Sequence, residues 1–175
     1  MRLLGNKLFL IGAACVAPLL AGWILYLSHW TPRDTGNYGE LISPRPLSGP
    51  ALDALRGKWV LVAFDAAACD SHCERKLYFM RQVRKAQGKE LERVERLWIV
   101  TDAGEPRPKL LAAIEGTRIS QLKNFAAAAD FPGDPAQHIY LIDPLGNLMM
   151  RFPPDPDPSR TIKDLQRLLK YSRFG

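Results

Sequence analysis

Residues 8–28 form a run of 21 consecutive uncharged and mostly apolar residues. A helix needs about 20 such residues to cross the hydrocarbon core of a bilayer, so this run predicts a membrane-spanning helix. Arg2 and Lys7 precede the run, whereas the first base that follows it, Arg33, is adjacent to Asp34. The positive-inside rule therefore predicts a cytoplasmic N-terminus and, in a bacterium, a single-pass protein of the inner membrane with its C-terminal part in the periplasm.

The competing interpretation of this segment is a signal peptide that is removed after export. Two features oppose it: the apolar run is long for a signal peptide, and no small-x-small cleavage site follows it before Trp30. Residues 13–15, Ala-Ala-Cys, are similar to a lipoprotein cleavage site, but Gly12 stands where a branched aliphatic residue is usual. We therefore expect residues 1–30 to be a transmembrane signal anchor, in which Cys15 has no role in the chemistry.

Beyond the anchor, the pattern predicts a linker and then one folded domain. Residues 31–50 contain four prolines and three glycines and lack helical or alternating periodicity, which is typical of a linker. In residues 51–175, continuous apolar runs indicate buried strands, and apolar residues at helical spacing indicate helices. The expected strands are residues 58–64, 97–101, 139–142 and 148–152; the expected helices are residues 71–87, 109–115 and 158–171, with a short turn or helix at 51–57 and helical turns from 119 to about 130.

These elements follow the order β-α-β-α-β-β-α. Strands that alternate with helices predict parallel pairing, and the last two strands, joined by a turn at residues 143–147, predict an antiparallel hairpin. Together they predict an α/β fold, a thioredoxin-like sandwich preceded by one transmembrane helix.

Composition and charge exclude several classes of function. Of the 24 bases only Arg2 and Lys7 precede residue 30, while all 18 acids follow it, so the expected domain carries a modest and dispersed positive charge. This argues against a nucleic-acid-binding protein with a basic stripe. Three cysteines exclude a small disulfide-framework protein. The sequence has no glycine-rich phosphate loop, H-E-x-x-H motif or nucleophile elbow, so nothing supports nucleotide binding, zinc catalysis or hydrolysis.

Cys69 and Cys73 form a C-x3-C motif between the first buried strand and the following helix. Peptide N–H groups at a helix start point outward and favour negative charge, so a thiolate at this place is stabilised and reactive. The spacing puts both sulfurs on one side of the first helical turn. They either close a disulfide or together bind a soft ion such as Cu(I). The alternative is two core cysteines at a chance spacing, because free cysteines are often buried.

The sequence around this motif resembles the SCO/SenC family. Residues 55–64, Leu-Arg-Gly-Lys-Trp-Val-Leu-Val-Ala-Phe, precede the C-x3-C motif as in that family. Val-Thr-Asp at residues 100–102 is similar to the family's second strand, and Tyr-Leu-Ile-Asp-Pro-Leu-Gly at residues 140–146 is similar to its hairpin. The resemblance covers residues 47–169. It implies a membrane-anchored thioredoxin-fold protein of cytochrome c oxidase copper assembly, in which Cys69 and Cys73 are Cu(I) ligands or a redox couple.

The residues that follow the two cysteines depart from the family pattern. The family's cysteines are usually each followed by proline, whereas Asp70 and Glu74 occupy these positions here. A carboxylate next to a thiol repels the negative charge of the thiolate. We therefore expect Asp70 and Glu74 to raise the pKa values of the two thiols and to disfavour the thiolate form.

The third copper ligand is the other departure. The family supplies a histidine about five residues before the tyrosine of the hairpin, and Pro135 stands at that spacing. His138 lies only two residues before Tyr140. Either His138 still reaches the cysteines as a third metal ligand, or strand alternation turns it to the opposite face. His72, between the cysteines, is a further candidate ligand.

These residues, together with the resemblance to the SCO/SenC family, imply three alternative functions. The first is a SCO-like protein that assists cytochrome c oxidase assembly, by handling Cu(I) or by keeping the cysteines of the copper site reduced. The second is a general periplasmic thiol-disulfide oxidoreductase, in which one cysteine attacks a client disulfide and the other resolves the mixed disulfide. The third is a thioredoxin-fold scaffold without metal. The expected partners are a cytochrome c oxidase subunit or another periplasmic thiol protein, and not nucleic acid.

Overall fold

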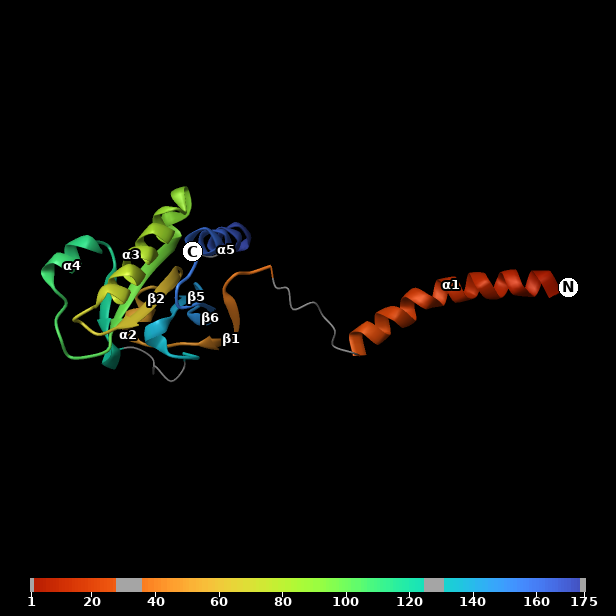
Figure 1. The fold of residues 1–175 in the computed structure, drawn as a ribbon, viewed down its shortest axis with the longest axis horizontal. Helices are drawn as coiled ribbons and strands as arrows, with labels where there is room; N and C mark the ends of the chain where they lie inside the picture. Colours follow the sequence, from red (N-terminus) through yellow and green to blue (C-terminus); the bar gives the residue numbers. More distant parts are fainter. Residues whose placement is uncertain (1, 28–35, 125–130, 174–175) are drawn as a thin grey trace. The chain divides into compact units, whose positions relative to one another are not determined.

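The computed structural model describes residues 2–27, 36–124 and 131–173. The chain divides into two compact units, Met1–Gly36 and Asn37–Gly175. In the described residues of the first unit the chain forms the helix α1 (Arg2–Leu27), drawn in red in Figure 1. Within the described residues, no helix combines the length and apolarity that crossing a membrane requires. The membrane-spanning helix expected at residues 8–28 therefore stays a prediction.

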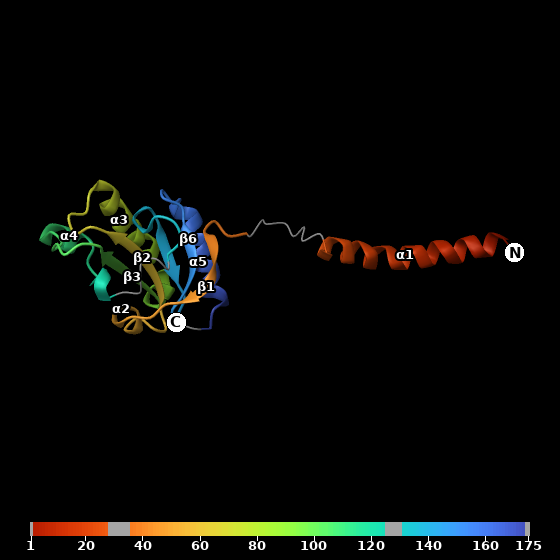
Figure 2. The ribbon, with the colours of Figure 1, turned by 90° about the horizontal axis from the view of Figure 1, so that it is seen from below.

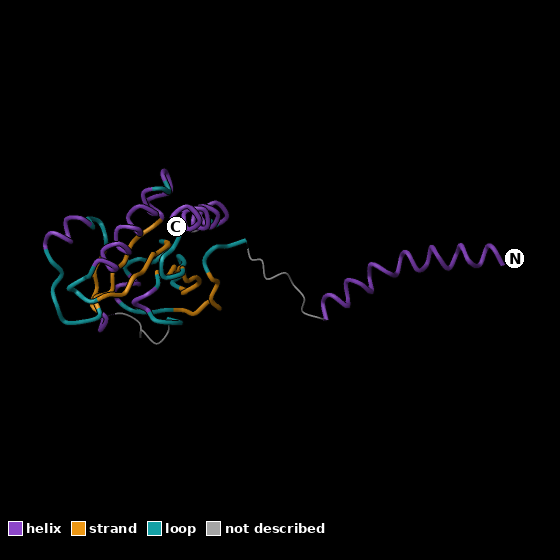
Figure 3. The backbone as a smooth tube through the Cα atoms, in the orientation of Figure 1, coloured by secondary structure: helices purple, strands orange, loops and turns teal. Residues whose placement is uncertain are grey.

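The second unit is built on a six-stranded mixed sheet with the strand order β1-β6-β5-β2-β3-β4. The pairs β2–β3 and β3–β4 are parallel, and the pairs β2–β5, β5–β6 and β1–β6 are antiparallel. Figure 3 shows the strands between layers of helix. The elements are β1 (Glu40–Pro46), α2 (Pro50–Asp53), β2 (Trp59–Asp65), α3 (Ser71–Lys85), β3 (Val94–Val100), α4 (Pro108–Ala113), β4 (Arg118–Gln121), β5 (Ile139–Ile142), β6 (Asn147–Phe152) and α5 (Pro158–Tyr171), with short 3₁₀ helices at Gly88–Arg93, Leu122–Asn124 and Pro135–Gln137.

Apolar side chains cover both faces of the central strand, as its continuous apolar sequence predicts. Leu61 and Ala63 face the core under α3 and α5, whereas Val62 and Phe64 face a second core that contains Leu52 of α2. Figure 1 shows α3 and α5 on one side of the sheet and α2 on the other. The α/β sandwich is thus confirmed, and its middle strand β2 leads directly into the cysteine motif.

Two strands were not predicted from the sequence. The strand β1 lies inside the proline-rich residues 31–50, and most of its side chains are exposed, so it has no apolar pattern that would indicate a strand. It pairs with β6 at the edge of the sheet (Figure 2). The strand β4 replaces the first of the helical turns expected from residue 119, because it adds to the edge of β3. Residues 125–130, the end of that expected helix, lie outside the described residues.

The helix α3 carries the second cysteine, and its sequence explains its position. Asp70 is the N-cap residue, and its carboxylate accepts hydrogen bonds from the His72 and Cys73 amides. Cys73, Leu77 and Met80 recur at helical spacing and are fully buried against the sheet. The helix begins after the short turn that follows β2, so Cys73 lies in the first helical turn, close after the central strand.

Candidate redox site

The two cysteines of the C-x3-C motif form a disulfide. Their Cα atoms lie 5.2 Å apart, within the range that a disulfide requires. This confirms the prediction that the spacing brings the two sulfurs together. Cys69 precedes the helix and has a φ of +42°, the only positive φ of a non-glycine residue in the described part of the chain. Backbone strain of this kind costs about 1–2 kcal/mol and is common at functional sites.

Asp70 places a carboxylate next to the disulfide. Its Oδ1 accepts from the amide nitrogens of His72 and Cys73, both at 2.9 Å. The hydrogen bond from the Cys73 amide, with a smaller contribution from the His72 amide, lowers the pKa of Asp70 below its usual value of 3.8. The carboxylate is therefore ionised at neutral pH, and it occupies helix N–H groups that would otherwise stabilise a thiolate.

Glu74, the carboxylate that follows Cys73, forms an ion pair with Arg107. Arg107 donates from its Nη2 to Glu74 Oε1 at 2.6 Å and to the backbone carbonyl of Cys69 at 2.8 Å. This pair connects the segment before α4 to the cysteine motif. Of the two carboxylates that replace the family's prolines, only Asp70 therefore acts as an unpaired negative charge on the reduced cysteines.

We expect the Asp70→Ser variant to react faster than the native protein. Serine is also a good N-cap residue, so the helix start is kept while the charge is removed. Loss of one nearby negative charge raises the thiolate fraction, and we expect an increase of about three- to tenfold in the exchange rate of the reduced protein with hydroxyethyl disulfide at pH 7. Because the pKa of Asp70 is lowered, the gain should persist from pH 8 down to pH 5.

A matched change elsewhere separates this local effect from net charge. Glu115→Gln removes one exposed carboxylate outside the site and should leave the exchange rate unchanged. An Asp70→Ser rate equal to the native rate would show that Asp70 does not influence the thiolate.

Lys76 and Asp65 form a buried ion pair next to the cysteine motif, which the sequence analysis missed. The Lys76 side chain is 4% exposed, and its Nζ lies 2.5 Å from Asp65 Oδ2. Burial raises the pKa of Asp65, although its hydrogen bond to Lys76 partly opposes this effect. The Lys76 ammonium also donates to the carbonyls of Phe64 and Ala136. One feature of the sequence could have indicated this pair. Lys76 stands on the apolar face of the expected helix, at helical spacing from Cys73 and Met80, where a lysine needs a buried partner.

His138 lies on the other side of the sheet from the cysteines. Its ring contacts Tyr140 edge-to-face, with ring centroids 6.1 Å apart, and its Nδ1 lies 2.8 Å from the carbonyl oxygen of Phe152. Tyr140 belongs to the core on the α2 face, whereas both cysteines belong to the core under α3. The orientation agrees with strand alternation, and the role of His138 as a metal ligand stays a prediction.

The remaining candidate ligands do not complete a metal site. Among residues 2–27, 36–124 and 131–173, no group of three or more His, Cys, Asp or Glu side chains is arranged to hold a metal ion. Pro135 begins a 3₁₀ helix and offers no ligating atom. The Nε2 of His72 is buried and has no hydrogen-bond partner among the described residues. Once reduced, the site offers two thiolates, which suit disulfide exchange or a two-coordinate soft ion.

Comparison with known proteins agrees with this fold. The family model described as "Transmembrane-like, thioredoxin-like, C-terminal domain" matches residues 59–172. The structure is similar to apo Sco1 from Thermus thermophilus, with a TM-score of 0.54 and 18% identity over 78% of this chain and 99% of that chain. It is also similar to copper-bound yeast Sco1, with a TM-score of 0.54 and 16% identity over 74% of this chain and 92% of that chain. No curated protein matches the sequence. The resemblance to SCO/SenC proteins is thereby confirmed for the thioredoxin-like fold.

Proposed function

Because the chain belongs to the transmembrane-like, thioredoxin-like, C-terminal domain family, we propose that it is a thiol-disulfide exchange protein that reduces the copper-site cysteines of cytochrome c oxidase. The observation that carries this proposal is the buried Cys69–Cys73 disulfide at the junction of β2 and α3. Two sulfurs that bond to each other in this position form a two-electron couple. The absence of a third grouped ligand in the described residues favours redox exchange over a three-ligand copper site.

The exchange balances in two steps. The Cys69 thiolate attacks one sulfur of a client disulfide, which forms a mixed disulfide and releases the other client sulfur as a thiolate that takes up a proton. The Cys73 thiolate then attacks the Cys69 sulfur and expels the remaining client thiolate. Two electrons and two protons pass from the dithiol to the client, and a dithiol donor protein must reduce Cys69–Cys73 again.

The client class comes from the similarity to Sco proteins. The SCO/SenC resemblance implies a place in cytochrome c oxidase assembly, where copper-site cysteines must be reduced before copper enters. Yeast Sco1 has been solved with copper bound. A second candidate function is therefore transient Cu(I) carriage by the reduced Cys69 and Cys73, because thiolates are the preferred ligands of Cu(I).

We further propose that α1 anchors the protein in the inner membrane, with Asn37–Gly175 in the periplasm. The support is the sequence: 21 uncharged residues at positions 8–28, with Arg2 and Lys7 before them. The periplasm is an oxidising compartment, in which a protein that keeps client cysteines reduced has a function.

The function is tested by mixing the reduced full chain with the copper-binding domain of a cytochrome c oxidase subunit in its disulfide form. We expect two new client thiols for each chain oxidised, measured by alkylation and mass spectrometry. Equal rates with unrelated protein disulfides would favour the general oxidoreductase instead. Failure to reduce any disulfide, together with failure to bind Cu(I), would favour the scaffold.

Cu(I) titration of the His138→Ala variant tests the second candidate. The imidazole shares the α2 face of the sheet with Tyr140, so we expect its loss to change Cu(I) affinity by less than about tenfold, or about 1.4 kcal/mol. Serine in place of either Cys69 or Cys73 should abolish binding under the same conditions. A loss of a hundredfold or more in His138→Ala would assign His138 to the metal site.

A further inference from the structure

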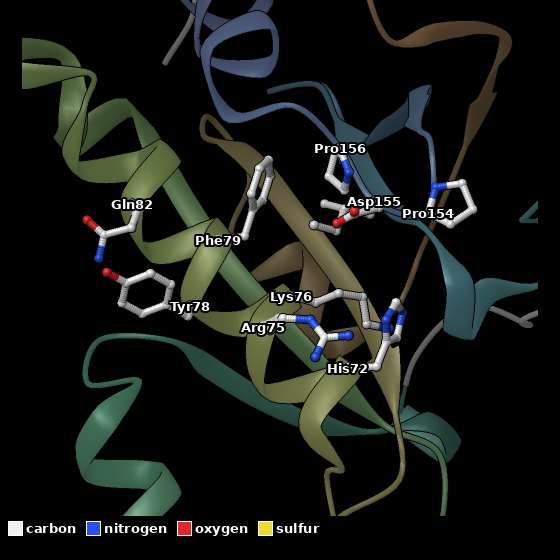
Figure 4. Close-up of a pocket in the computed structure, with 10 residues that line it drawn as sticks. His72, Arg75, Lys76, Tyr78, Phe79, Gln82, Pro154, Asp155 and Pro156 are labelled. Carbon is white, nitrogen blue, oxygen red and sulfur yellow. The ribbon is translucent and has the colours of Figure 1, made fainter.

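A pocket of about 240 Å³ lies between one face of α3 and the loop that joins β6 to α5 (Figure 4). Phe79 of α3, Ile139 of β5 and Pro154 and Pro156 of the loop give it an apolar wall. The volume is of the order of one large side chain. His72, which stands between the two cysteines in the sequence, also lines the pocket, so one end of the pocket reaches the first turn of α3, which carries Cys73.

The end of the pocket near the start of α3 is basic. Arg75 is exposed and has no hydrogen-bond or ion-pair partner among the described residues. The buried Nε2 of His72 is also without a partner there. Lys76, which lines the pocket as well, already pairs with Asp65. The acid in the lining is Asp155, which the loop contributes together with Pro154 and Pro156.

The spacing along α3 relates the basic end to the apolar wall. Arg75 and Phe79 are four residues apart, which is about 6 Å along a helix axis. In an extended peptide, side chains two residues apart share a face and lie about 6.6 Å apart. The two spacings are nearly equal. An extended client segment that lies along α3 therefore places one side chain opposite Arg75 and the side chain two residues further opposite Phe79. One further step of two residues in the other direction brings the segment to the cysteine motif.

From this geometry we propose that the pocket binds an extended client segment with a carboxylate two residues from its reactive cysteine and a large apolar side chain two residues beyond that carboxylate. Arg75 pairs with the carboxylate, and the apolar side chain packs against Phe79 and Ile139. Asp155 disfavours a second acid at the apolar position. The inference rests on the proposed function, because it assigns the client of the same disulfide, and the redox step is the exchange described above.

The test measures how fast the reduced full chain reduces two peptides, each joined through its cysteine to 2-mercaptoethanol by a disulfide. The first peptide is Cys-Ala-Glu-Ala-Phe, tested also in reverse order, and the second is Cys-Ala-Lys-Ala-Ser. Each rate is divided by the rate with hydroxyethyl disulfide, which is neutral and has no side chains. We expect at least about a tenfold preference for one order of the acidic peptide over the basic peptide.

Two variants and a matched control assign the preference to the pocket. Arg75→Glu should remove or reverse the preference, and Phe79→Ala should weaken it. Lys89→Glu makes the same charge change at an exposed position outside the pocket and should keep the full preference. Equal relative rates for all peptides, or an unchanged preference in Arg75→Glu, would overturn the inference while the exchange function stands.

A binding measurement distinguishes failure of the proposed disulfide exchange from failure of the proposed peptide-binding pocket. The acidic peptide with serine in place of cysteine is titrated into the oxidised full chain by calorimetry. If no disulfide is reduced, the proposed function fails, and saturable binding that Arg75→Glu abolishes would still support the pocket. Absence of binding to the native chain would overturn the pocket inference by itself.

Discussion

Serine in place of Cys73 is expected to trap a client as a stable mixed disulfide, whereas serine in place of Cys69 is expected to trap none. Both variants should lose net reduction entirely, because each leaves a single sulfur. Cys73 is fully buried inside the first turn of α3, and Cys69, at 3% exposure, precedes the helix. The sulfur that lies outside the helix is the better placed to meet a client, so we expect Cys69 to attack and Cys73 to resolve the mixed disulfide.

Trapping is measured by non-reducing electrophoresis and mass spectrometry of the reduced variant after mixing with client disulfide. Cys15 is a free, exposed cysteine of α1 and would add a second adduct, so both variants are prepared with Cys15→Ser. The Cys15→Ser protein with an intact pair serves as the control and should retain native activity. An adduct formed by Cys69→Ser and not by Cys73→Ser would reverse the assigned roles.

The Lys76→Met variant is expected to lose about 3 kcal/mol of unfolding free energy at pH 7. Methionine fills the volume of the buried aliphatic stem, but Asp65 then keeps its charge at a half-buried site without a cation. Removal of one member of a buried ion pair typically costs about 3–5 kcal/mol. The carbonyls of Phe64 and Ala136 also lose their shared donor. Denaturant unfolding of the oxidised protein measures the change.

The loss should shrink as the pH falls. Burial raises the pKa of Asp65 above 3.8, so this carboxyl contributes more to stability when protonated and less as the pH rises through its folded pKa. Without Lys76 that pKa rises further. The deficit of Lys76→Met should therefore be largest at pH 7 and should diminish toward pH 4, as Asp65 takes up a proton.

Two further variants test this explanation. The double variant Asp65→Asn, Lys76→Met removes both charges and should recover more than half of the lost stability, because paired charges can often be replaced by neutral groups at little cost. Lys85→Met changes an exposed lysine at the end of the same helix and should alter the unfolding free energy by less than about 0.5 kcal/mol. A loss below about 1 kcal/mol in Lys76→Met would show that the pair contributes little.

The elements that could be predicted from the sequence are those whose buried side chains leave an apolar pattern within the element itself. The strand β2 and the helix α5 have clear apolar patterns, and the predicted helix 158–171 matches Pro158–Tyr171. The strand β1 escaped prediction because it is held by pairing with β6 and by Asp164, whose Oδ2 accepts from the amides of Tyr38 and Gly39. Such contacts join residues more than 100 positions apart and leave no local periodicity.

In the candidate site, too, local features could be predicted from the sequence and long-range contacts could not. The cysteine pair was predictable because its spacing and its position after a buried strand are local features. The charge balance around it was not, because Glu74 is neutralised by Arg107, which lies 33 residues away in the chain. Lys76 and Asp65 are separated by the turn that carries the disulfide, and nothing in the sequence indicates that their side chains meet.

The strand β1 also gives the segment between α1 and the folded domain a protective role. Because β1 is the outermost strand beside β6, it covers the N–H and C=O groups of β6 that would otherwise form an open edge. Gly39, just before β1, allows the chain to pack closely against β6, because a Cβ there would lie 2.5 Å from the Met150 sulfur. An exposed edge strand is a template for intermolecular pairing. Proteolytic release of the domain by cleavage after Pro46 would therefore yield a species prone to self-association through β6, whereas cleavage before Tyr38 would leave the edge covered.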